Sequence, residues 1–405
     1  MKIAIAGAGI GGLALAILLA RQGHQVEVFD QFDTPAPVGS GLMLQETGLA
    51  VLRAFGLEAE AIARAAPISR LFGKTAPSDR TVLDVRFTAL RRNLCAYGIQ
   101  RSALFDILYA EAEQAGAHFT GNTEIIETDT QDSSFLTRSG KALKGFDLLV
   151  DALGANSPLS SEPRSELPFG ALWATVDWPE QGPFIDDALE QRYRAARQMT
   201  GMMPSGSPSE GAGPTATYFW SIEGAGFEAW KSGGMDAWRG EAEALWPETA
   251  PIVQALDADA LTFARYRHRT LGSPVRGRLV HIGDSWHATS PQLGQGANMA
   301  LLDAYGLAKA LEEHPRNLGV ALKRYRTLRG AHVRLYQTMS WLFTPVYQSR
   351  GSVLPALRDW IAAPLTRVPP APALLAAMVS GAFGSPLKRL ELDAESLAQH
   401  TISQA

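Results

Sequence analysis

Hydrophobic and polar positions follow two different periods along this chain of 405 residues. Short apolar runs such as "KIAIA" at positions 2–6 are typical of strands buried on both faces of a parallel sheet. A glycine-rich loop follows, and then apolar positions at helical spacing, as in "LALAILLARQ" at 13–22. This order of strand, loop and helix recurs near both ends of the chain, and it predicts an α/β domain with a parallel sheet.

The pattern changes between positions 163 and 270. Runs rich in aromatic and β-branched residues, such as "ALWATVDWP" and "TATYFWSIEG", are separated there by Gly-, Pro- and Ser-rich segments. Such runs predict an antiparallel sheet. The earlier stretch "RLFGKTAPSDRTVLDVRF" predicts a β-hairpin, which we assign to the same sheet.

We therefore expect a Rossmann-like α/β domain, an inserted antiparallel sheet domain and a helical C-terminal region. The α/β domain is discontinuous (1–69, 97–163 and 270–330), the sheet domain comprises 70–96 and 164–269, and the helical region comprises 331–405. The helical region is apolar and interrupted by prolines. Packing onto the α/β domain is the favoured interpretation, with a dimer contact or loose membrane association as alternatives.

The first strand–loop–helix unit contains a nucleotide-binding motif. Gly7, Gly9 and Gly12 have the spacing G-x-G-x-x-G, with Gly11 as an additional glycine. In such a loop the glycines permit a tight turn, close approach of the backbone to a pyrophosphate and close helix packing, while the helix N-terminus offers N–H groups to the phosphates. The next strand ends at Asp30, an acid that can accept hydrogen bonds from a ribose diol. The motif predicts a dinucleotide, either NAD or FAD.

A second unit of this kind occurs at 277–304. Its strand, "GRLVHIGD", ends at Asp284, and a loop with Pro291, Gly294 and Gly296 leads into an apolar helix. Two such units at opposite ends of the chain suggest one extended ligand bound between them. Arg101 precedes a further helix, for which we expect Ser102 as the N-cap. Arg101 is equally consistent with a surface residue and with an anion-binding residue.

Composition restricts the function further. The net charge is −4, so nothing points to nucleic acid or to an anionic membrane surface as a partner. The single cysteine, Cys95, excludes a disulfide framework and a Cys-rich metal site, which agrees with a reducing compartment. No apolar run reaches the roughly 18 residues typical of a membrane span, and the glycine spacing near the N-terminus argues against a signal peptide. We expect a cytoplasmic monomer or homodimer without a metal.

Three motifs together resemble a known family. "GAGIGG", "LLVDALGANS" and "GDSWHATSPQLGQGANMALLDA" are similar to the three fingerprints of the class A FAD-dependent aromatic monooxygenases, the para-hydroxybenzoate hydroxylase-like flavoproteins. The resemblance covers most of the chain, and the third motif is the most specific. It implies FAD as cofactor and NADH or NADPH as reductant. It also implies that O2 adds to the reduced flavin, and that the resulting C4a-hydroperoxide hydroxylates an aromatic or conjugated small molecule.

The resemblance also implies roles for individual residues. Gly7, Gly9 and Gly12 would hold the FAD pyrophosphate, Asp30 would bind the adenosine ribose, and Arg101 would open the helix beside the cofactor. The complete set of candidate cofactor-binding residues is Gly7, Gly9, Gly11, Gly12, Asp30, Gly41, Leu42, Arg101, Asp284, Pro291, Gly294, Gly296, Ala297 and Asn298.

Within this set, the later residues would surround the flavin itself. Asp284 would bind the ribityl and pyrophosphate region, and Pro291 would lie beside the isoalloxazine. The N–H groups around 296–298 would face flavin N1 and O2, where a helix N-terminus stabilises negative charge. The backbone of Gly41 and Leu42 would pass the other edge of the ring.

Two positions depart from the family pattern. Leu153 stands where the middle fingerprint normally has an Asp that is implicated in FAD and NAD(P)H binding. The departure bears more on the nicotinamide than on FAD, and Asp151 is a candidate substitute. Trp286 replaces a small residue after Gly-Asp. Packing is its favoured role, and a wall or lid near the cofactor is the alternative.

Candidate substrate residues come from the sheet domain. Tyr218 and Trp220 share one face of an expected strand, and that face is a candidate wall of an apolar cavity, with ordinary core packing as the alternative. The candidates are Tyr218, Trp220, Trp173, Met203 and Pro291.

Ionisable residues give no catalytic signature. We expect His268 on a surface strand and His287 in structural hydrogen bonds. No catalytic residue is assigned, because no Ser-His-Asp set, carboxylate pair or metal spacing is evident, as suits chemistry carried by a bound cofactor. The alternatives are a flavin-dependent dehydrogenase, reductase or halogenase on the same fold, and a non-catalytic flavin-fold binding protein.

Overall fold

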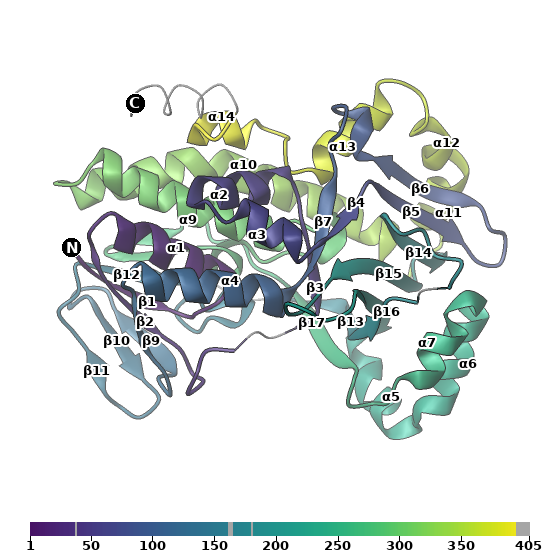
Figure 1. Ribbon diagram of the computed structural model, residues 1–405, viewed down its shortest axis with the longest axis horizontal. Coiled ribbons are helices and arrows are strands. Elements are labelled where there is room, and N and C mark those ends of the chain that lie inside the picture. The colour runs from purple at the N-terminus through teal and green to yellow at the C-terminus, as the bar shows by residue number, and fades with distance from the viewer. Residues whose placement is uncertain (37–38, 161–164, 180, 394–405) are drawn as a thin grey trace.

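A parallel sheet forms the centre of one half of the molecule. The computed structural model describes residues 1–36, 39–160, 165–179 and 181–393 (Figure 1). The six strands lie in the order β18-β19-β12-β1-β2-β8, and neighbours from β19 to β8 are parallel. Their bounds are β1 (Lys2–Ala6), β2 (Gln25–Phe29), β8 (His118–Thr120), β12 (Leu148–Asp151), β18 (Val275–Arg276) and β19 (Leu279–His281). The expected Rossmann-like sheet is confirmed.

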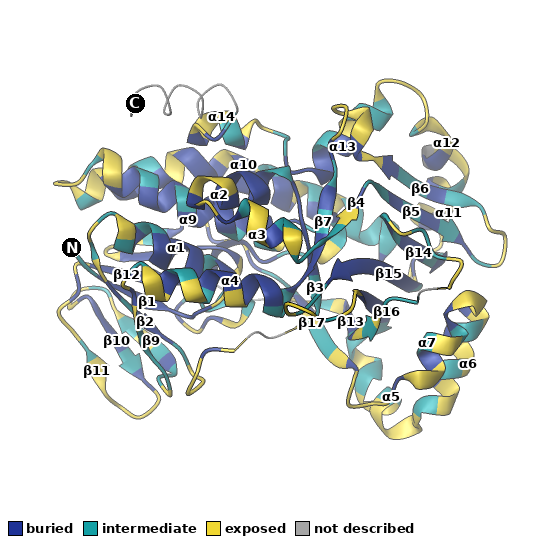
Figure 2. Cartoon of the chain, viewed as in Figure 1, coloured by how far each residue is buried: buried dark blue, intermediate teal, exposed yellow. Residues whose placement is uncertain are grey.

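Side chains alternate between the two faces of this sheet. Ile3 and Ile5 belong to the large core shared with the helices, whereas Ala4 and Ala6 face a second core containing Phe135. The first face is covered by α1 (Ile10–Arg21), α4 (Arg101–Gln114), α9 (Gly296–Glu313) and α10 (Leu318–Tyr347), with α2 (Glu46–Phe55) and α3 (Glu58–Ala63) outside them. The second face is covered by the meander β9 (Ile125–Asp129), β10 (Ser134–Thr137) and β11 (Ala142–Leu143). Both faces are therefore buried, as Figure 2 shows.

The second half of the molecule is built on a seven-stranded sheet in the order β17-β13-β16-β15-β14-β5-β6. Its strands are β5 (Arg70–Thr75), β6 (Thr81–Arg86), β13 (Ser165–Asp177), β14 (Ala188–Arg194), β15 (Gln198–Gly206), β16 (Thr215–Glu223) and β17 (Thr262–His268). The hairpin expected from "RLFGKTAPSDRTVLDVRF" is confirmed as β5 and β6. All neighbours are antiparallel except β14 and β5. The exact division of the chain into domains stays a prediction.

Three helices on one face of the seven-stranded sheet were not expected from the sequence. They are α5 (Phe227–Gly233), α6 (Met235–Leu245) and α7 (Ala250–Ala255). Trp238 of α6 packs edge-on against the rings of Tyr218 and Trp220. This face of the sheet is therefore filled by protein core.

A small sheet joins the two halves. Its strands β3 (Gly41–Leu44), β7 (Ala96–Gln100) and β4 (Ala66–Ile68) lie in the order β3-β7-β4. The amide N of Gly41 donates to Thr217 Oγ1 on β16 at 3.0 Å. Gln100 Nε2 donates to Thr215 Oγ1 at 2.9 Å. The connection fixes one face of the seven-stranded sheet against the α/β half.

The C-terminal region packs against both halves of the molecule. Its helices are α11 (Val353–Leu357), the π-helix η6 (Arg358–Ala362), α12 (Ala363–Leu365), α13 (Ala371–Val379) and α14 (Pro386–Leu390). Elements η6, α12 and α13 contact β6 of the seven-stranded sheet, α11 contacts α10, and α14 contacts α2, α9 and α10. Ala376, Met378 and Val379 of α13 and Leu390 of α14 belong to the large core of the α/β half, and Tyr336 Oη donates to the Met378 carbonyl at 2.8 Å. The expected packing onto the α/β domain therefore holds for α13 and α14, whereas η6 and α12 pack on the seven-stranded sheet. The last residues, 394–405, lie outside the described part. Within the described chain, no helix combines the length and apolarity needed to span a membrane.

Candidate cofactor and substrate site

The glycine loop after β1 has the geometry of a phosphate cradle. Gly7 has φ of 101°, and a Cβ on Gly12 would lie 2.1 Å from the carbonyl oxygen of Gly7, so neither position tolerates a side chain. A Cβ on Gly9 would meet no atom within 4 Å. Helix α1 begins at the next residue without a side-chain cap, so its first N–H groups are left for a ligand. The loop is tight where it packs and open where a phosphate would approach.

Asp30 is held beside this loop. Its Oδ2 accepts a hydrogen bond from the Ala8 amide at 2.9 Å, and its Oδ1 accepts one from the Phe32 amide at 3.1 Å. Each carboxylate oxygen keeps a further lone pair. The side chain is half-buried, so a ribose diol can reach it.

Arg101 is the first residue of α4, and Gln100 occupies the cap position without a side-chain bond. The expected N-cap at Ser102 is therefore wrong. The Nε of Arg101 is buried and has no hydrogen-bond partner among the described residues. Burial lowers the pKa of the guanidinium, and the charge of Asp284 opposes that shift. A half-buried cation with a buried, unused donor is a binding group for an anion such as a pyrophosphate.

The second glycine-containing loop, at 284–298, alternates between exposed and buried residues. The exposed residues are Asp284, at the start of α8 (Asp284–His287), Pro291, at the start of η5 (Pro291–Leu293), and Gly296, at the start of α9. Their neighbours Leu293, Asn298 and Met299 are buried. Helix α9 also begins without a side-chain cap, so its N-terminal N–H groups face outward beside Asp284 and Pro291.

Asn298 has a structural role that the sequence did not reveal. Its side-chain Nδ2 donates to the Met43 carbonyl at 2.9 Å and to Gln45 Oε1 at 2.7 Å, and its Oδ1 accepts from the Gln45 amide at 2.9 Å. The side chain is fully buried. It joins β3 to the first turn of α9, so only the Asn298 backbone can face a cofactor.

A buried ionic network fixes the same loop from below. Asp303 Oδ2 accepts hydrogen bonds from the Gly283 amide at 2.9 Å and from His287 Nε2 at 2.6 Å, and its Oδ1 accepts from Arg329 Nε at 2.7 Å. Burial alone would raise the pKa of Asp303, but His287 and Arg329 outweigh it and hold that pKa below its usual range. The structural role expected for His287 is confirmed. Asp303 and Arg329 were missed.

The middle motif is also structural. Asp151 is fully buried; it accepts from the Leu153 amide at 3.0 Å, from Ser157 Oγ at 2.5 Å and from His281 Nδ1 at 2.8 Å. It is thus committed to its own loop and is not a substitute for the Asp missing at Leu153. Trp286 is buried, donates to the Leu271 carbonyl at 3.3 Å and packs against Tyr325. The favoured packing role of Trp286 is confirmed.

The candidate substrate residues lie on two different faces of the seven-stranded sheet. Tyr218 and Trp220 pack under α6, on the face opposite to the one that meets β3, so this candidate pair is wrong. Trp173 and Met203 lie on the other face. On that face Trp173 is paired across neighbouring strands with Phe219, and Met203 with Thr217. Tyr266, which was not a candidate, forms a hydrogen bond with Trp173, and burial raises its pKa.

Two sets of hydrogen bonds connect this face to the cofactor loops. On one side, Gln292 Nε2 donates to Gln348 Oε1 at 3.2 Å, and Gln348 Nε2 donates to the Gly170 carbonyl of β13 at 3.4 Å. On the other side, Ser40 Oγ lies 3.1 Å from Thr175 Oγ1, which also donates to Gln100 Oε1 at 3.1 Å. Thr175 is exposed and Trp173 is half-buried. The loops and the sheet face thus meet along a polar, accessible border.

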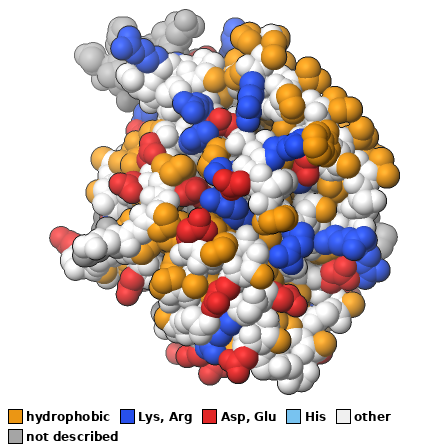
Figure 3. All heavy atoms as spheres, turned by 90° about the vertical axis from the view of Figure 1, so that its right-hand side faces the viewer, with side chains coloured by type: hydrophobic (Ala, Val, Ile, Leu, Met, Phe, Trp, Pro, Cys, Tyr) orange, Lys and Arg blue, Asp and Glu red, His pale blue; other side chains and the backbone are white. Residues whose placement is uncertain are grey.

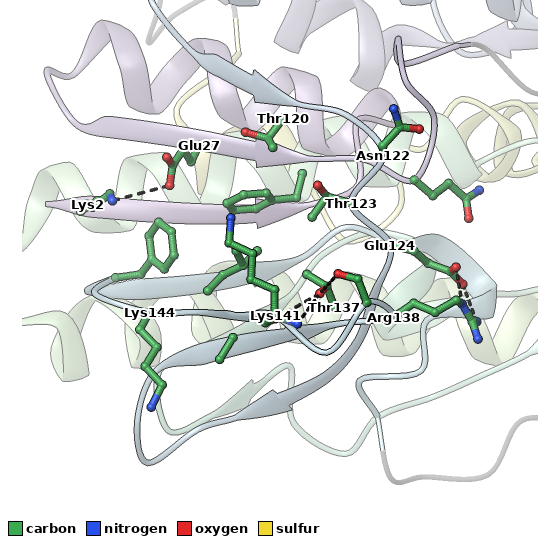
Figure 4. A pocket seen from close by; sticks show the side chains of 16 residues that line it. Lys2, Glu27, Thr120, Asn122, Thr123, Glu124, Thr137, Arg138, Lys141 and Lys144 are labelled. Atoms are coloured by element: carbon green, nitrogen blue, oxygen red, sulfur yellow. Dashed lines mark hydrogen bonds and ion pairs between the residues drawn. The ribbon is translucent and has the colours of Figure 1, made fainter.

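A separate groove of about 650 Å³ lies on the other side of the parallel sheet (Figure 4). It runs between β2 and the meander, and its basic side chains Lys2 and Arg138 contact Glu27 and Glu124. His268, at the end of β17, is half-buried, and burial lowers its pKa. Among the described residues no group of three His, Cys, Asp or Glu side chains is arranged to hold a metal ion.

Comparison with known proteins agrees with this geometry. The family described as "FAD binding domain" matches residues 1–158 and 228–336, so the chain belongs to that family. Kynurenine 3-monooxygenase from Stenotrophomonas maltophilia (strain K279a) is 29% identical over 369 residues, covering 84% of this chain and 78% of that protein. The 3-amino-4-hydroxybenzoate 2-monooxygenase of Streptomyces cremeus is 27% identical over 337 residues, covering 81% of this chain and 83% of that protein.

The fold is shared with a solved structure, that of Klebsiella pneumoniae HpxO complexed with FAD and uric acid. The TM-score is 0.77 at 19% identity, covering 95% of this chain and 98% of that one. Together with its three motifs, these matches make the chain a class A FAD-dependent monooxygenase, as the resemblance implied. The open glycine loop, the buried Arg101 donor and the two uncapped helices are suited to FAD.

Proposed function

We propose that this monooxygenase hydroxylates an uncharged aromatic or conjugated small molecule, which binds between the 291–297 loop and the sheet face carrying Trp173 and Thr175. FAD is held by Gly7, Gly9, Gly12, Asp30, Arg101 and the 284–298 loop, and NADH or NADPH is the reductant. The observation that carries the proposal is the accessible border between the cofactor loops and the sheet, closed at both sides by hydrogen bonds.

The chemistry of the sheet face supports a neutral ring. Across the middle of β13, β15 and β16 this face carries Trp173, Thr175, Met203, Ser205, Thr217 and Phe219. None of these side chains is ionised, so a substrate carboxylate would lose its hydration without gaining a charged partner there. Thr175 is exposed and Trp173 is half-buried, whereas the other four are buried against neighbouring protein. The Thr175 hydroxyl and the Trp173 ring therefore match phenolic, amino or ring-nitrogen substituents.

The chain contributes orientation and electrostatics to the reaction. FAD, when bound, would supply the redox chemistry of the hydroxylation, with NADH or NADPH as reductant and O2 as oxidant. Arg101 offsets phosphate charge, and the uncapped N-terminus of α9 supplies N–H groups where negative charge develops. The buried residues Leu293, Asn298 and Met299, in and directly after the 284–298 loop, exclude water from one side of the site.

The test is a ligand panel on FAD-loaded protein. Neutral phenols, anilines and nitrogen heterocycles are compared with their carboxylated counterparts for stimulation of NADH or NADPH oxidation, O2 uptake and formation of a product heavier by one oxygen. We expect the neutral compounds to be turned over. Preferential turnover of the carboxylates would contradict the substrate proposal, and turnover without O2 would favour the dehydrogenase alternative.

Substitution of Thr175 tests whether the substrate binds at this border. Thr175→Val removes a hydroxyl at the border, and we expect KM to rise several-fold, equivalent to about 1 kcal/mol, with kcat little changed. Thr128→Val, on the meander strand β9, is the matched control with an unchanged KM. An equal KM for both variants would move the substrate elsewhere.

Compartment and assembly are also part of the proposal. With Cys95 as the only cysteine, the chain needs no oxidising environment to fold, and we assign it to the cytoplasm. All the site residues named above come from one chain, so a monomer suffices for activity, and a homodimer is the alternative.

A further inference from the structure

Exposed hydrophobic side chains are concentrated in one segment of the chain. Thirteen large hydrophobic residues are exposed in the described part, and ten of them lie between positions 341 and 374. The ten are Trp341, Leu342, Val353, Leu354, Leu357, Trp360, Ile361, Leu365, Val368 and Leu374. We call this surface the apolar face. The two indoles are each 67% exposed, and such a concentration on a monomer marks an interaction site.

The segment that carries the apolar face is anchored to the rest of the protein. Its central residue Arg358 is buried; its guanidinium donates to the carbonyls of Val346 and Ala195 at 3.1 Å and lies over the rings of Tyr193 and Tyr347. These contacts fix η6 to the end of α10 and to the turn between β14 and β15. The short helices therefore hold their hydrophobic side chains outward in a fixed arrangement.

The charge of this segment is opposite to that of the whole chain. Residues 334–374 contain four arginines and one aspartate, a net charge of +3, in a chain of net charge −4. Arg334 and Arg367 are exposed, whereas the exposed Arg350 is paired with Glu223 at 2.6 Å. The Arg80 guanidinium lies 3.3 Å from the centre of the Trp360 ring. Figure 3 shows hydrophobic side chains gathered on the upper part of this side of the molecule, with Lys and Arg side chains along their border.

We propose that the apolar face binds the surface of an anionic phospholipid bilayer. The indole and aliphatic side chains would enter the headgroup region, where tryptophan is favoured, while Arg334 and Arg367 would pair with lipid phosphates. The described helices are too short or too polar to cross the bilayer, so binding is peripheral. A second copy of this chain is a poorer occupant, because a two-fold contact would place two segments of charge +3 against each other.

Co-sedimentation with vesicles tests the proposal. FAD-loaded full-length protein is mixed with vesicles of phosphatidylcholine alone, or of phosphatidylcholine with about one third phosphatidylglycerol, a typical anionic surface. We expect binding to the anionic vesicles, weakening as salt is raised. Trp341→Ser with Trp360→Ser should reduce the partition coefficient at least about tenfold. Arg367→Glu should reduce it on anionic vesicles alone.

Control variants keep the result interpretable. Val320→Ser removes an exposed aliphatic residue from the other end of α10 and should leave vesicle binding unchanged. Unchanged FAD content and thermal stability show that the tryptophan variant is folded, and Arg367→Glu tests the same surface without altering its apolar side chains. The proposal is overturned if wild-type protein sediments with neither vesicle. It is also overturned if sedimentation velocity shows a dimer that Trp341→Ser dissociates while vesicle binding is absent.

Discussion

The buried network around Asp303 supports the cofactor loop, and its removal has a calculable cost. Asp303→Asn keeps the shape of the side chain but removes its charge and turns one acceptor into a donor. The carboxylate takes hydrogen bonds from Gly283, His287 and Arg329, and both Asp303 and Arg329 are fully buried. The variant leaves the Arg329 cation without its counter-charge. Breaking a buried ion pair in this way costs about 3–5 kcal/mol.

Urea denaturation of the FAD-free protein measures this cost. We expect the free energy of unfolding to fall by about 3–5 kcal/mol for Asp303→Asn. Asp132→Asn is the matched control: Asp132 pairs with Lys144 at 3.2 Å, but both side chains are 60% exposed, so its loss should stay within about 0.5 kcal/mol. A loss below about 1 kcal/mol for Asp303→Asn would refute the reasoning.

A double variant isolates the pair. Arg329→Met combined with Asp303→Asn removes both charges, so the combined loss should be smaller than the sum of the single losses by about 1–3 kcal/mol. Because Gly283 immediately precedes Asp284, Asp303→Asn should also weaken FAD binding in fluorescence titrations. Strict additivity of the two single losses would show that the two charges do not interact as described.

Three further predictions concern individual residues of the α/β half. Gly9→Ala places its methyl group in open space, so we expect an unchanged melting temperature without FAD but weaker FAD binding, whereas Gly12→Ala, which clashes with the backbone, should lose stability as well. Arg101→Met removes a half-buried cation whose Nε donor is buried and unused. The FAD dissociation constant should therefore rise at least about tenfold without loss of FAD-free stability, and an unchanged constant would exclude Arg101 from the cofactor site. Burial and the Arg329 charge lower the pKa of His332 to about 3. Between that value and the ordinary histidine pKa, His332 is therefore protonated in the unfolded chain but neutral in the folded chain. Stability should fall by about 1.4 kcal/mol per pH unit as the pH drops from about 6.5 toward 3, and His332→Gln should flatten that dependence in urea titrations between pH 7 and 4.5.

Local sequence predicted the elements whose causes are local. The G-x-G-x-x-G spacing, the apolar period of α1 and the turn between β5 and β6 depend on neighbouring residues, and all were recognisable. Helices α5 to α7 were missed because Gly233 and Gly234 interrupt them. They are short, and their tryptophans gain stability only by packing on the seven-stranded sheet.

Long-range contacts explain the errors at the site. Alternation places Tyr218 and Trp220 on one face of β16, but it does not say which of the two faces is covered by α6 and which lies toward β3 and the cofactor loops. An acid inside the apolar helix "NMALLDAYGLA" was a signal for Asp303, yet its partner Arg329 is on the next helix. Whole-chain charge likewise concealed the basic segment at 334–374, because an average does not record where charges lie.

The strand order of the parallel sheet has a consequence for biosynthesis. Strand β1 is synthesised before β12 and β19, which extend the sheet on one side of it, and before α9, which packs against α1. These later elements come from positions 148–151, 279–281 and 296–313. While the ribosome is still elongating the chain, the N-terminal strand therefore lacks these neighbours and exposes apolar surface. A nascent chain released before α9 would contain every glycine of the first motif and still be unable to enclose FAD. We therefore expect FAD to bind only after α9 has been synthesised, because the second cofactor loop and the helix that follows it end at residue 313.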